Sequence, residues 1–182
     1  MTNSVAVIVG SLRKDSLNLK LAQALEKLAA GKLVFDYVDI GDLPAYNDDL
    51  WVNPPASVLR MKEQVAKADG LLMLTPEYNR SYAGILKNAM DWGSRPYGQG
   101  VWQGKATAVA GTSPGSIGAA VGQARLRADL ASLSTVLAPL PEVNLQWKPA
   151  AYDESGDVID AGTRAFLQGY IDQFAAFIAK NA

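Results

Sequence analysis

Three nearly unbroken apolar runs constrain this chain more than any other feature of its sequence. A strand that is apolar on both faces is typical of a parallel sheet covered by helices on both sides. A fourth segment is more mixed in polarity but also reads as a strand. In chain order, the four expected strands are residues 5–9, 33–38, 70–75 and 105–111.

Apolar residues recur at helical spacing between and after these runs. The spacing predicts helices across 17–28, 58–68, 120–133 and 166–178. Strands that alternate with helices predict a right-handed, doubly wound parallel sheet. A length of 182 residues suits one domain, which we expect to span 1–182.

The fifth strand is less regular in the sequence. Two segments qualify for it, 135–137 and 142–145, and two prolines, Pro139 and Pro141, lie between them. Proline cannot donate a backbone hydrogen bond, so it interrupts strand pairing. The sequence leaves both positions open.

The chain contains neither cysteine nor histidine. Without cysteine there is no disulfide, thiolate metal site or cysteine nucleophile. Without histidine the chain lacks the commonest general base and the commonest metal ligand. We therefore expect no metal site and no catalytic side chain, and we expect a bound cofactor to carry the chemistry.

The formal net charge of −1 provides no large positive field. We expect neither nucleic acid nor an anionic membrane as a partner. No apolar run reaches membrane-spanning length, and the opening residues lack a basic leader. A cytoplasmic protein is the default expectation.

The loop after the first strand has the composition of an anion site. Gly10 permits a tight exit from the strand, and Ser11, Ser16 and Asn18 offer short polar side chains. Arg13 supplies a planar, forked cation that suits phosphate oxygens. The start of the next helix adds unpaired N–H groups and a favourable dipole. Together these features predict a phosphate monoester site.

Two alternatives bear on this loop. Ser16 alone is equally well explained as a helix cap. The loop is neither a G-x-G-x-x-G sequence nor a Walker A sequence, which favours one terminal phosphate over a dinucleotide or a triphosphate.

The loops after the third and fourth strands are candidates for the sides of a ring pocket. Residues 75–84 carry an aromatic, an amide and several backbone donors, with Tyr78 and Asn79 at the strand exit. Residues 111–118 are small, so a ring can approach their backbone. Ligands of doubly wound sheets bind beyond the carboxyl ends of the strands, where these loops meet the first one.

Several nearby residues have simpler interpretations. We expect Trp92 to be a packing residue, and we expect Lys87 and Asp91, four apart on one helix, to form a surface ion pair. Trp51 and Trp102 lie in long loops, where each suits a core position, a lid over the pocket or an intersubunit contact, and we expect the contact for both.

Three motifs carry a resemblance to a known family. They are GSLRKDSLN at 10–18, PEYNRSYAGILKNAMDW at 76–92 and GTSPGSIGA at 111–119. The chain resembles the NADPH-dependent FMN reductase family, in particular its chromate- and quinone-reductase branch. The resemblance implies a flavodoxin-like, three-layer α/β/α fold with a five-stranded parallel sheet in the order 2-1-3-4-5.

The resemblance also implies the residues that contact FMN. The phosphate would be held by Ser11, Arg13, Ser16, Leu17 and Asn18. The isoalloxazine ring would lie beside Pro76, Glu77, Tyr78 and Asn79, with Ser113 and Gly115 on another side. Arg80, Tyr82, Asn47 and Asp48 would lie toward the substrate, the last two reaching the flavin of a neighbouring subunit.

The activity implied is ping-pong hydride transfer. NADH or NADPH would reduce FMN at N5, and the flavin would then reduce a quinone, a free flavin, chromate or a similar small molecule. Members of the family are homodimers or homotetramers. A non-enzymatic, flavodoxin-type electron carrier is the alternative, although such carriers are strongly acidic and this chain is nearly balanced in charge.

Overall fold

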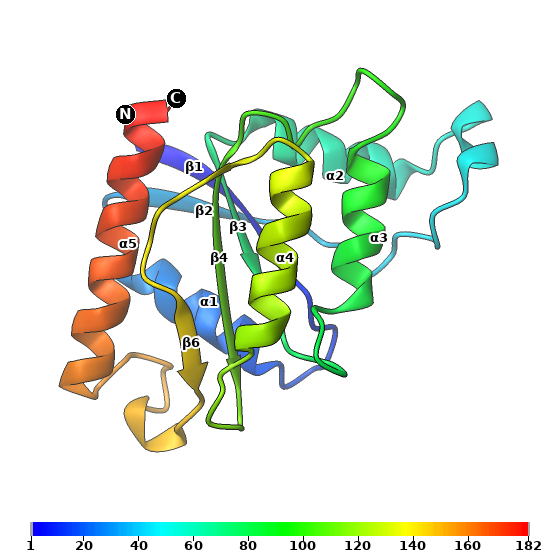
Figure 1. Ribbon diagram of the computed structural model, residues 1–182. Helices are drawn as coiled ribbons and strands as arrows, with labels where there is room; N and C mark the ends of the chain where they lie inside the picture. Colours follow the sequence, from blue (N-terminus) through cyan, green and yellow to red (C-terminus); the bar gives the residue numbers. More distant parts are fainter. Residues whose placement is uncertain (1, 182) are drawn as a thin grey trace.

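A parallel sheet with helices on both faces forms the body of the molecule (Figure 1). The computed structural model describes residues 2–181. Its elements in chain order are β1 (Asn3–Val9), α1 (Leu17–Leu28), β2 (Leu33–Tyr37), the 3-10 helix η1 (Asp48–Val52), α2 (Ala56–Lys67), β3 (Gly70–Leu74), α3 (Gly84–Gly93), β4 (Ala106–Ser113), α4 (Ala120–Ser132), β5 (Val136–Leu137), β6 (Val143–Gln146), the 3-10 helix η2 (Pro149–Ala151) and α5 (Ala161–Asn181).

The strand order is β2-β1-β3-β4-β5, which confirms the predicted order. The predicted number of strands was one too low, because both candidate segments for the fifth position are strands. β5 pairs with Ala106 and Thr107 at the start of β4, and β6 pairs with Ala110–Ser113 at its end. The proline-rich segment between them splits this position of the sheet into two short strands.

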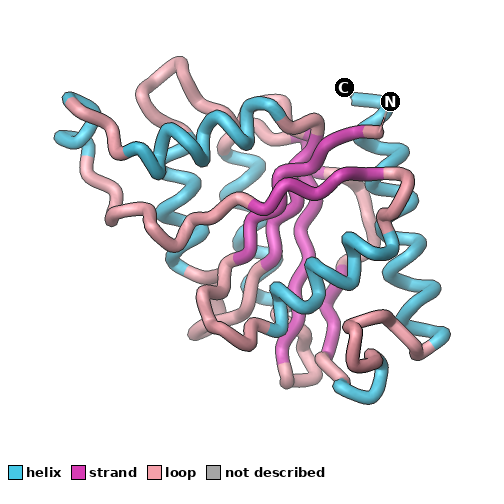
Figure 2. Tube along the Cα trace, turned by 180° about the vertical axis from the view of Figure 1, so that it is seen from behind, coloured by secondary structure: helices cyan, strands magenta, loops and turns pink. Residues whose placement is uncertain are grey.

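Strand alternation directs side chains into two cores. Val5 and Val7 of β1 face the core under α1 and α5, whereas Ala6 and Ile8 face the core under α2, α3 and α4. Each of these four side chains is at most 1% exposed. The two helical layers lie on opposite faces of the sheet (Figure 2). The doubly wound arrangement predicted from the apolar runs is confirmed.

Two of the four tryptophans are core residues. Trp92 is fully buried, as expected for packing. The expectation that Trp102 forms an intersubunit contact was wrong, because it is 1% exposed and its indole N–H donates to the Met90 carbonyl at 3.0 Å. A Cβ on Gly93 would lie 2.2 Å from the Trp102 ring, so glycine is required there. Trp51 packs edge-on against Trp92, with ring centroids 5.3 Å apart.

Two segments extend beyond the three layers. Residues 41–55, which include η1, project from the α2–α3 end of the molecule, and residues 94–104 form a second excursion (Figure 1). On the surface, Lys87 and Asp91 form the expected ion pair at 2.5 Å. Within residues 2–181, no helix has the length and apolar character needed to cross a bilayer.

Candidate functional site

Three loops leave the sheet at the carboxyl ends of β1, β3 and β4. The first loop comprises residues 10–16, the second 75–83 and the third 114–119. Because parallel neighbours end at the same edge, the three loops are adjacent. This edge is where doubly wound sheets bind their ligands.

The first loop is fixed by hydrogen bonds at both ends, and its middle residues are exposed. The Gly10 N–H donates to the Leu74 carbonyl at 2.8 Å, and a Cβ on Gly10 would lie 2.7 Å from Leu86. Ser16 is buried and caps α1, because its hydroxyl accepts the Leu19 N–H at 3.1 Å. The capping interpretation of Ser16 is therefore confirmed. Between these fixed points, the exposed Arg13 side chain forms no hydrogen bond or ion pair with any residue of 2–181.

Asn18 fastens the start of α1 to the end of β4. Its side-chain amide donates to the Thr112 carbonyl at 3.1 Å, and its carbonyl oxygen accepts the Thr112 N–H at 3.0 Å. Asn18 and Thr112 are both buried. The amide of Asn18 thus holds the first and third loops together, a role that the sequence did not indicate.

The second loop folds back on itself as a tight turn. Tyr78 and Ser81 exchange two backbone hydrogen bonds of 2.9 and 3.0 Å. Between them, Asn79 and Arg80 have positive φ values of 51° and 61°. Two successive left-handed residues are typical of a type I′ turn, which asparagine tolerates and arginine does not favour. The turn leaves Tyr78 49% exposed at the edge of the sheet.

Glu77 points from the second loop to the start of α4. Its carboxylate accepts the N–H groups of Val121 at 3.0 Å and Gly122 at 3.1 Å, and it lies 3.6 Å from Arg80. The residue that precedes α4, Ala119, offers no side-chain cap. Glu77 therefore supplies the missing acceptor for these N–H groups, and its negative charge suits the positive end of the helix dipole.

A pocket of about 460 Å³ joins the first and second loops. This volume lies within the range of small-molecule sites, roughly 300–1,000 Å³. The lining combines one unpaired cation with apolar groups and glycines: Gly10, Leu12, Arg13, Tyr78, Ala83, Gly84 and Ile85. A Cβ on Gly84 would meet nothing within 4 Å, so the protein's own packing does not require glycine there.

Comparisons with known proteins identify the family of this chain. Residues 3–148 match the family model described as NADPH-dependent FMN reductase. The chain belongs to this family. It is 48% identical over 178 residues to 2-hydroxy-1,4-benzoquinone reductase of a Burkholderia species, covering 98% of this chain and 97% of the relative. It is 46% identical over 179 residues to a quinone reductase of Pseudomonas putida, covering 98% and 96%.

A solved relative has nearly the same structure. FerB of Paracoccus denitrificans, a flavoenzyme NAD(P)H:(acceptor) oxidoreductase, superposes with a TM-score of 0.97. Its sequence is 56% identical, and the match covers 99% of each chain. The flavodoxin-like fold expected from the motifs is thereby confirmed.

The pocket has features that an FMN reductase needs. Arg13 is free to pair with a phosphate, and the unpaired N–H groups at the start of α1 lie beside it in the chain. Gly84 leaves backbone open to the approach of a flat ring. The residues present therefore fit a flavin mononucleotide.

Of the eleven expected FMN contacts, Arg13 and Tyr78 line this pocket and the other nine do not. The Ser113 hydroxyl of the third loop donates to the Gly115 carbonyl at 3.2 Å, and neither residue lines the pocket. Leu17 begins α1 and lies outside it as well. Sequence reasoning missed four lining residues, which are Leu12, Ala83, Gly84 and Ile85. A glycine at the first position of a helix was the available signal for Gly84.

The expected substrate-side residues are spread over three places in this FMN reductase. Arg80 is exposed on the turn, whereas the half-buried Tyr82 donates its hydroxyl to the Asp129 carboxylate on α4. Burial and this carboxylate raise the pKa of Tyr82. Asn47 caps η1 by accepting the Asp49 N–H at 3.0 Å, and Asp48 accepts the Tyr46 hydroxyl at 2.8 Å.

The last pair lies on the projecting segment. Neither Asn47 nor Asp48 lines the pocket between the first two loops of the same chain. Among residues 2–181, no group of three or more His, Cys, Asp or Glu residues is arranged to hold a metal ion.

Proposed function

We propose that this chain is a one-domain, FMN-dependent NAD(P)H oxidoreductase that reduces quinones. The observation that carries the proposal is the pocket that joins the unpaired Arg13 to the turn at Tyr78. Two relatives with nearly full-length similarity are named as quinone reductases, which supports a quinone as the acceptor. A hydroxylated benzoquinone is the first substrate to test, because one relative is named for its reduction.

The proposed division of labour follows the three loops. Arg13 and the N–H groups at the start of α1 bind the phosphate, with Ser11 beside them. Tyr78, Asn79 and the backbone at Gly84 border the ring. Asn18 and Glu77 keep the loops in register by binding the backbone of neighbouring elements.

FMN supplies the redox chemistry when bound, by accepting a hydride from NADH or NADPH and returning two electrons to the acceptor. The protein orients the ring and provides a surface against which the donor and the acceptor stack in turn. Tyr78 is half exposed at the pocket, where it can contact such planar molecules. Because the two substrates use one place, the expected kinetics are ping-pong.

Self-association is part of the proposal. Val52 and Tyr97 are 95% and 94% exposed, and they lie on the two segments that project from the three layers. Large apolar side chains on projecting segments are typical of surfaces that a second subunit covers. A homodimer or a homotetramer would cover them and place Asn47 and Asp48 near a neighbouring pocket. Sedimentation analysis distinguishes these states from a monomer.

Steady-state kinetics test the function. In the absence of oxygen, the purified protein loaded with FMN should oxidise about one equivalent of NADH or NADPH by itself, and should turn over repeatedly when 2-hydroxy-1,4-benzoquinone or 1,4-benzoquinone is present. Double-reciprocal plots at several quinone concentrations should be parallel. Intersecting lines would rule out a single binding place shared by the coenzyme and the quinone. Absence of quinone-dependent oxidation of NADH and NADPH would rule out the quinone reductase activity. Chromate belongs in the same assay as a further candidate acceptor.

Since the electron donors are coenzymes of the cell interior, we propose a cytoplasmic location.

A further inference from the structure

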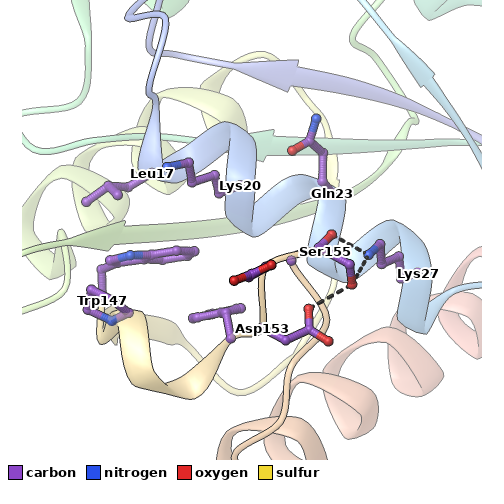
Figure 3. Close-up of a pocket in the computed structure, with 11 residues that line it drawn as sticks. Leu17, Lys20, Gln23, Lys27, Trp147, Asp153 and Ser155 are labelled. Carbon is purple, nitrogen blue, oxygen red and sulfur yellow. Dashed lines mark hydrogen bonds between the residues drawn. The ribbon is translucent and has the colours of Figure 1, made fainter.

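A second cavity lies between α1 and the segment 147–156 (Figure 3). Its volume is about 550 Å³, and it shares no lining residue with the pocket between the first two loops. A cavity of this size suits a small molecule, for which sites span roughly 300–1,000 Å³. The proposed quinone reductase activity does not use this cavity.

One wall of the cavity is flat and aromatic. Trp147 and Tyr152 stack with ring centroids 4.2 Å apart and an angle of 10° between their planes. Leu17 lies across from the Trp147 ring, on α1 (Figure 3). The Tyr152 hydroxyl is buried without a hydrogen-bond partner in the described structure. A planar apolar group can stack on such a surface, which favours an aromatic ligand.

At one end of the cavity, polar and charged groups of the protein form hydrogen bonds and an ion pair with one another. Lys27 donates to the Ser155 carbonyl at 2.6 Å and pairs with Asp157 at 2.9 Å. The Asp153 carboxylate accepts the Ser155 hydroxyl at 2.7 Å and the Asp157 N–H at 2.8 Å. These hydrogen bonds fix the segment against α1, and they leave Lys27 and Asp153 engaged within the protein.

Two other charged groups of the lining are not engaged. The side chains of Lys20, on α1, and Glu154, on the facing segment, form no hydrogen bond or ion pair with any residue of 2–181. A ligand with only a carboxylate would meet Lys20 but also the negative Glu154. A ligand with only an ammonium group would pair with Glu154 but would be repelled by the positive Lys20. A molecule that carries both groups satisfies both side chains.

We propose that this cavity binds a small aromatic zwitterion, the chemical class of the aromatic amino acids. The ring stacks on Trp147, the carboxylate pairs with Lys20 and the ammonium pairs with Glu154. The inference does not depend on the proposed quinone reductase activity, because the two pockets have separate linings.

Amide chemical shifts of the FMN-loaded protein test the site with three matched molecules. L-phenylalanine has both charges, 3-phenylpropionate lacks the ammonium and phenethylamine lacks the carboxylate. L-phenylalanine should shift the amides of Trp147, Ser155 and Gly156 with a dissociation constant below about 1 mM. Each of the other two molecules should bind about two- to fivefold more weakly, since it loses one exposed ion pair.

Two variants assign the charges. Lys20→Gln should make L-phenylalanine bind no better than phenethylamine, and Glu154→Gln should make it bind no better than 3-phenylpropionate. Lys180→Gln, at an exposed lysine near the end of α5, is the control and should bind as the parent does. Equal affinity for all three molecules would overturn the proposal. So would unchanged amides at 147–156 with about 10 mM L-phenylalanine, or shifts confined to the residues of the flavin pocket.

Discussion

The Glu77 carboxylate accepts the N–H of Gly122 at 3.1 Å and thereby ties the second loop to the start of α4. The fit around this contact is close, because a Cβ on Gly122 would lie 3.1 Å from the Ser81 carbonyl oxygen. The turn at Tyr78 is thus held between α4 and the pocket. Its shape depends on a side chain that binds the start of α4 and does not line the pocket.

Two replacements of Glu77 should distinguish the contribution of its charge to the free energy of unfolding from that of its hydrogen bonds. Glu77→Ala leaves the two N–H groups of α4 without an acceptor and should lower the free energy of unfolding by about 1–2 kcal/mol. Glu77→Gln keeps an acceptor and should lose roughly half of that. Urea unfolding of both variants measures the difference. Equal losses would show that the hydrogen bonds are not what stabilises the loop.

Removal of Arg13 should weaken FMN binding without unfolding the protein. A charge-assisted contact to phosphate contributes about 2 kcal/mol, so Arg13→Ala should raise the FMN dissociation constant about 30-fold. Quenching of flavin fluorescence in a titration measures this constant. Lys14→Ala is the matched control, because Lys14 is an exposed cation of the same loop that does not line the pocket. An equal effect of both variants would contradict a specific role for Arg13.

A side chain at position 84 should weaken FMN binding without lowering the free energy of unfolding. Because a Cβ there meets open space, Gly84→Ala should keep or raise the free energy of unfolding, and Gly84→Val should still fold. Both should bind FMN more weakly, Gly84→Val by about tenfold or more. Gly169→Ala in α5, where a Cβ also meets nothing within 4 Å, is the control. Unchanged FMN affinity in Gly84→Val would place the ring elsewhere.

Asn18 should prove to be a structural residue first. Asn18→Leu leaves the buried N–H and carbonyl of Thr112 without partners and should lower the free energy of unfolding by about 2–3 kcal/mol. Thermal unfolding in the absence of FMN measures this loss. A variant that is fully stable without FMN and fails only in phosphate binding would contradict the structural role.

Alkaline stability should depend on Tyr82. Burial and the Asp129 carboxylate raise the pKa of its phenol above the ordinary value of 10.0. The unfolded chain therefore releases this proton first, and stability is retained below pH 10 and falls as the pH rises above it. Tyr82→Phe should make the loss of stability above pH 10 less steep, and Asp129→Asn should act in the same direction. Unfolding titrations from pH 8 to 11 test both.

The sequence predicted the parts of the fold that depend on local pattern. Apolar runs gave three central strands, and helical spacing gave the layers, because burial on both faces leaves a clear signal. The split between β5 and β6 was not predictable, since it depends on which part of β4 each short strand meets. The burial of Trp102 was missed because it depends on the absence of a side chain at Gly93, the last residue of α3.

The candidate site was predicted in composition but not in detail. Arg13 and the strand exit at Tyr78 could be chosen because forked cations and strand exits have general roles. The tasks of Asn18 and Glu77 could not, because each binds backbone groups more than 40 residues away in the chain. Such partners become visible only when the loops are placed in space.

Anaerobic reduction of the reconstituted protein tests the central claim most directly. After incubation with excess FMN and desalting, the protein should retain about one FMN per chain and show its yellow absorbance. One equivalent of NADH or NADPH should bleach that absorbance, and a quinone should restore it. A protein that remains colourless after incubation with FMN, or a bound flavin that neither coenzyme bleaches, would contradict the account.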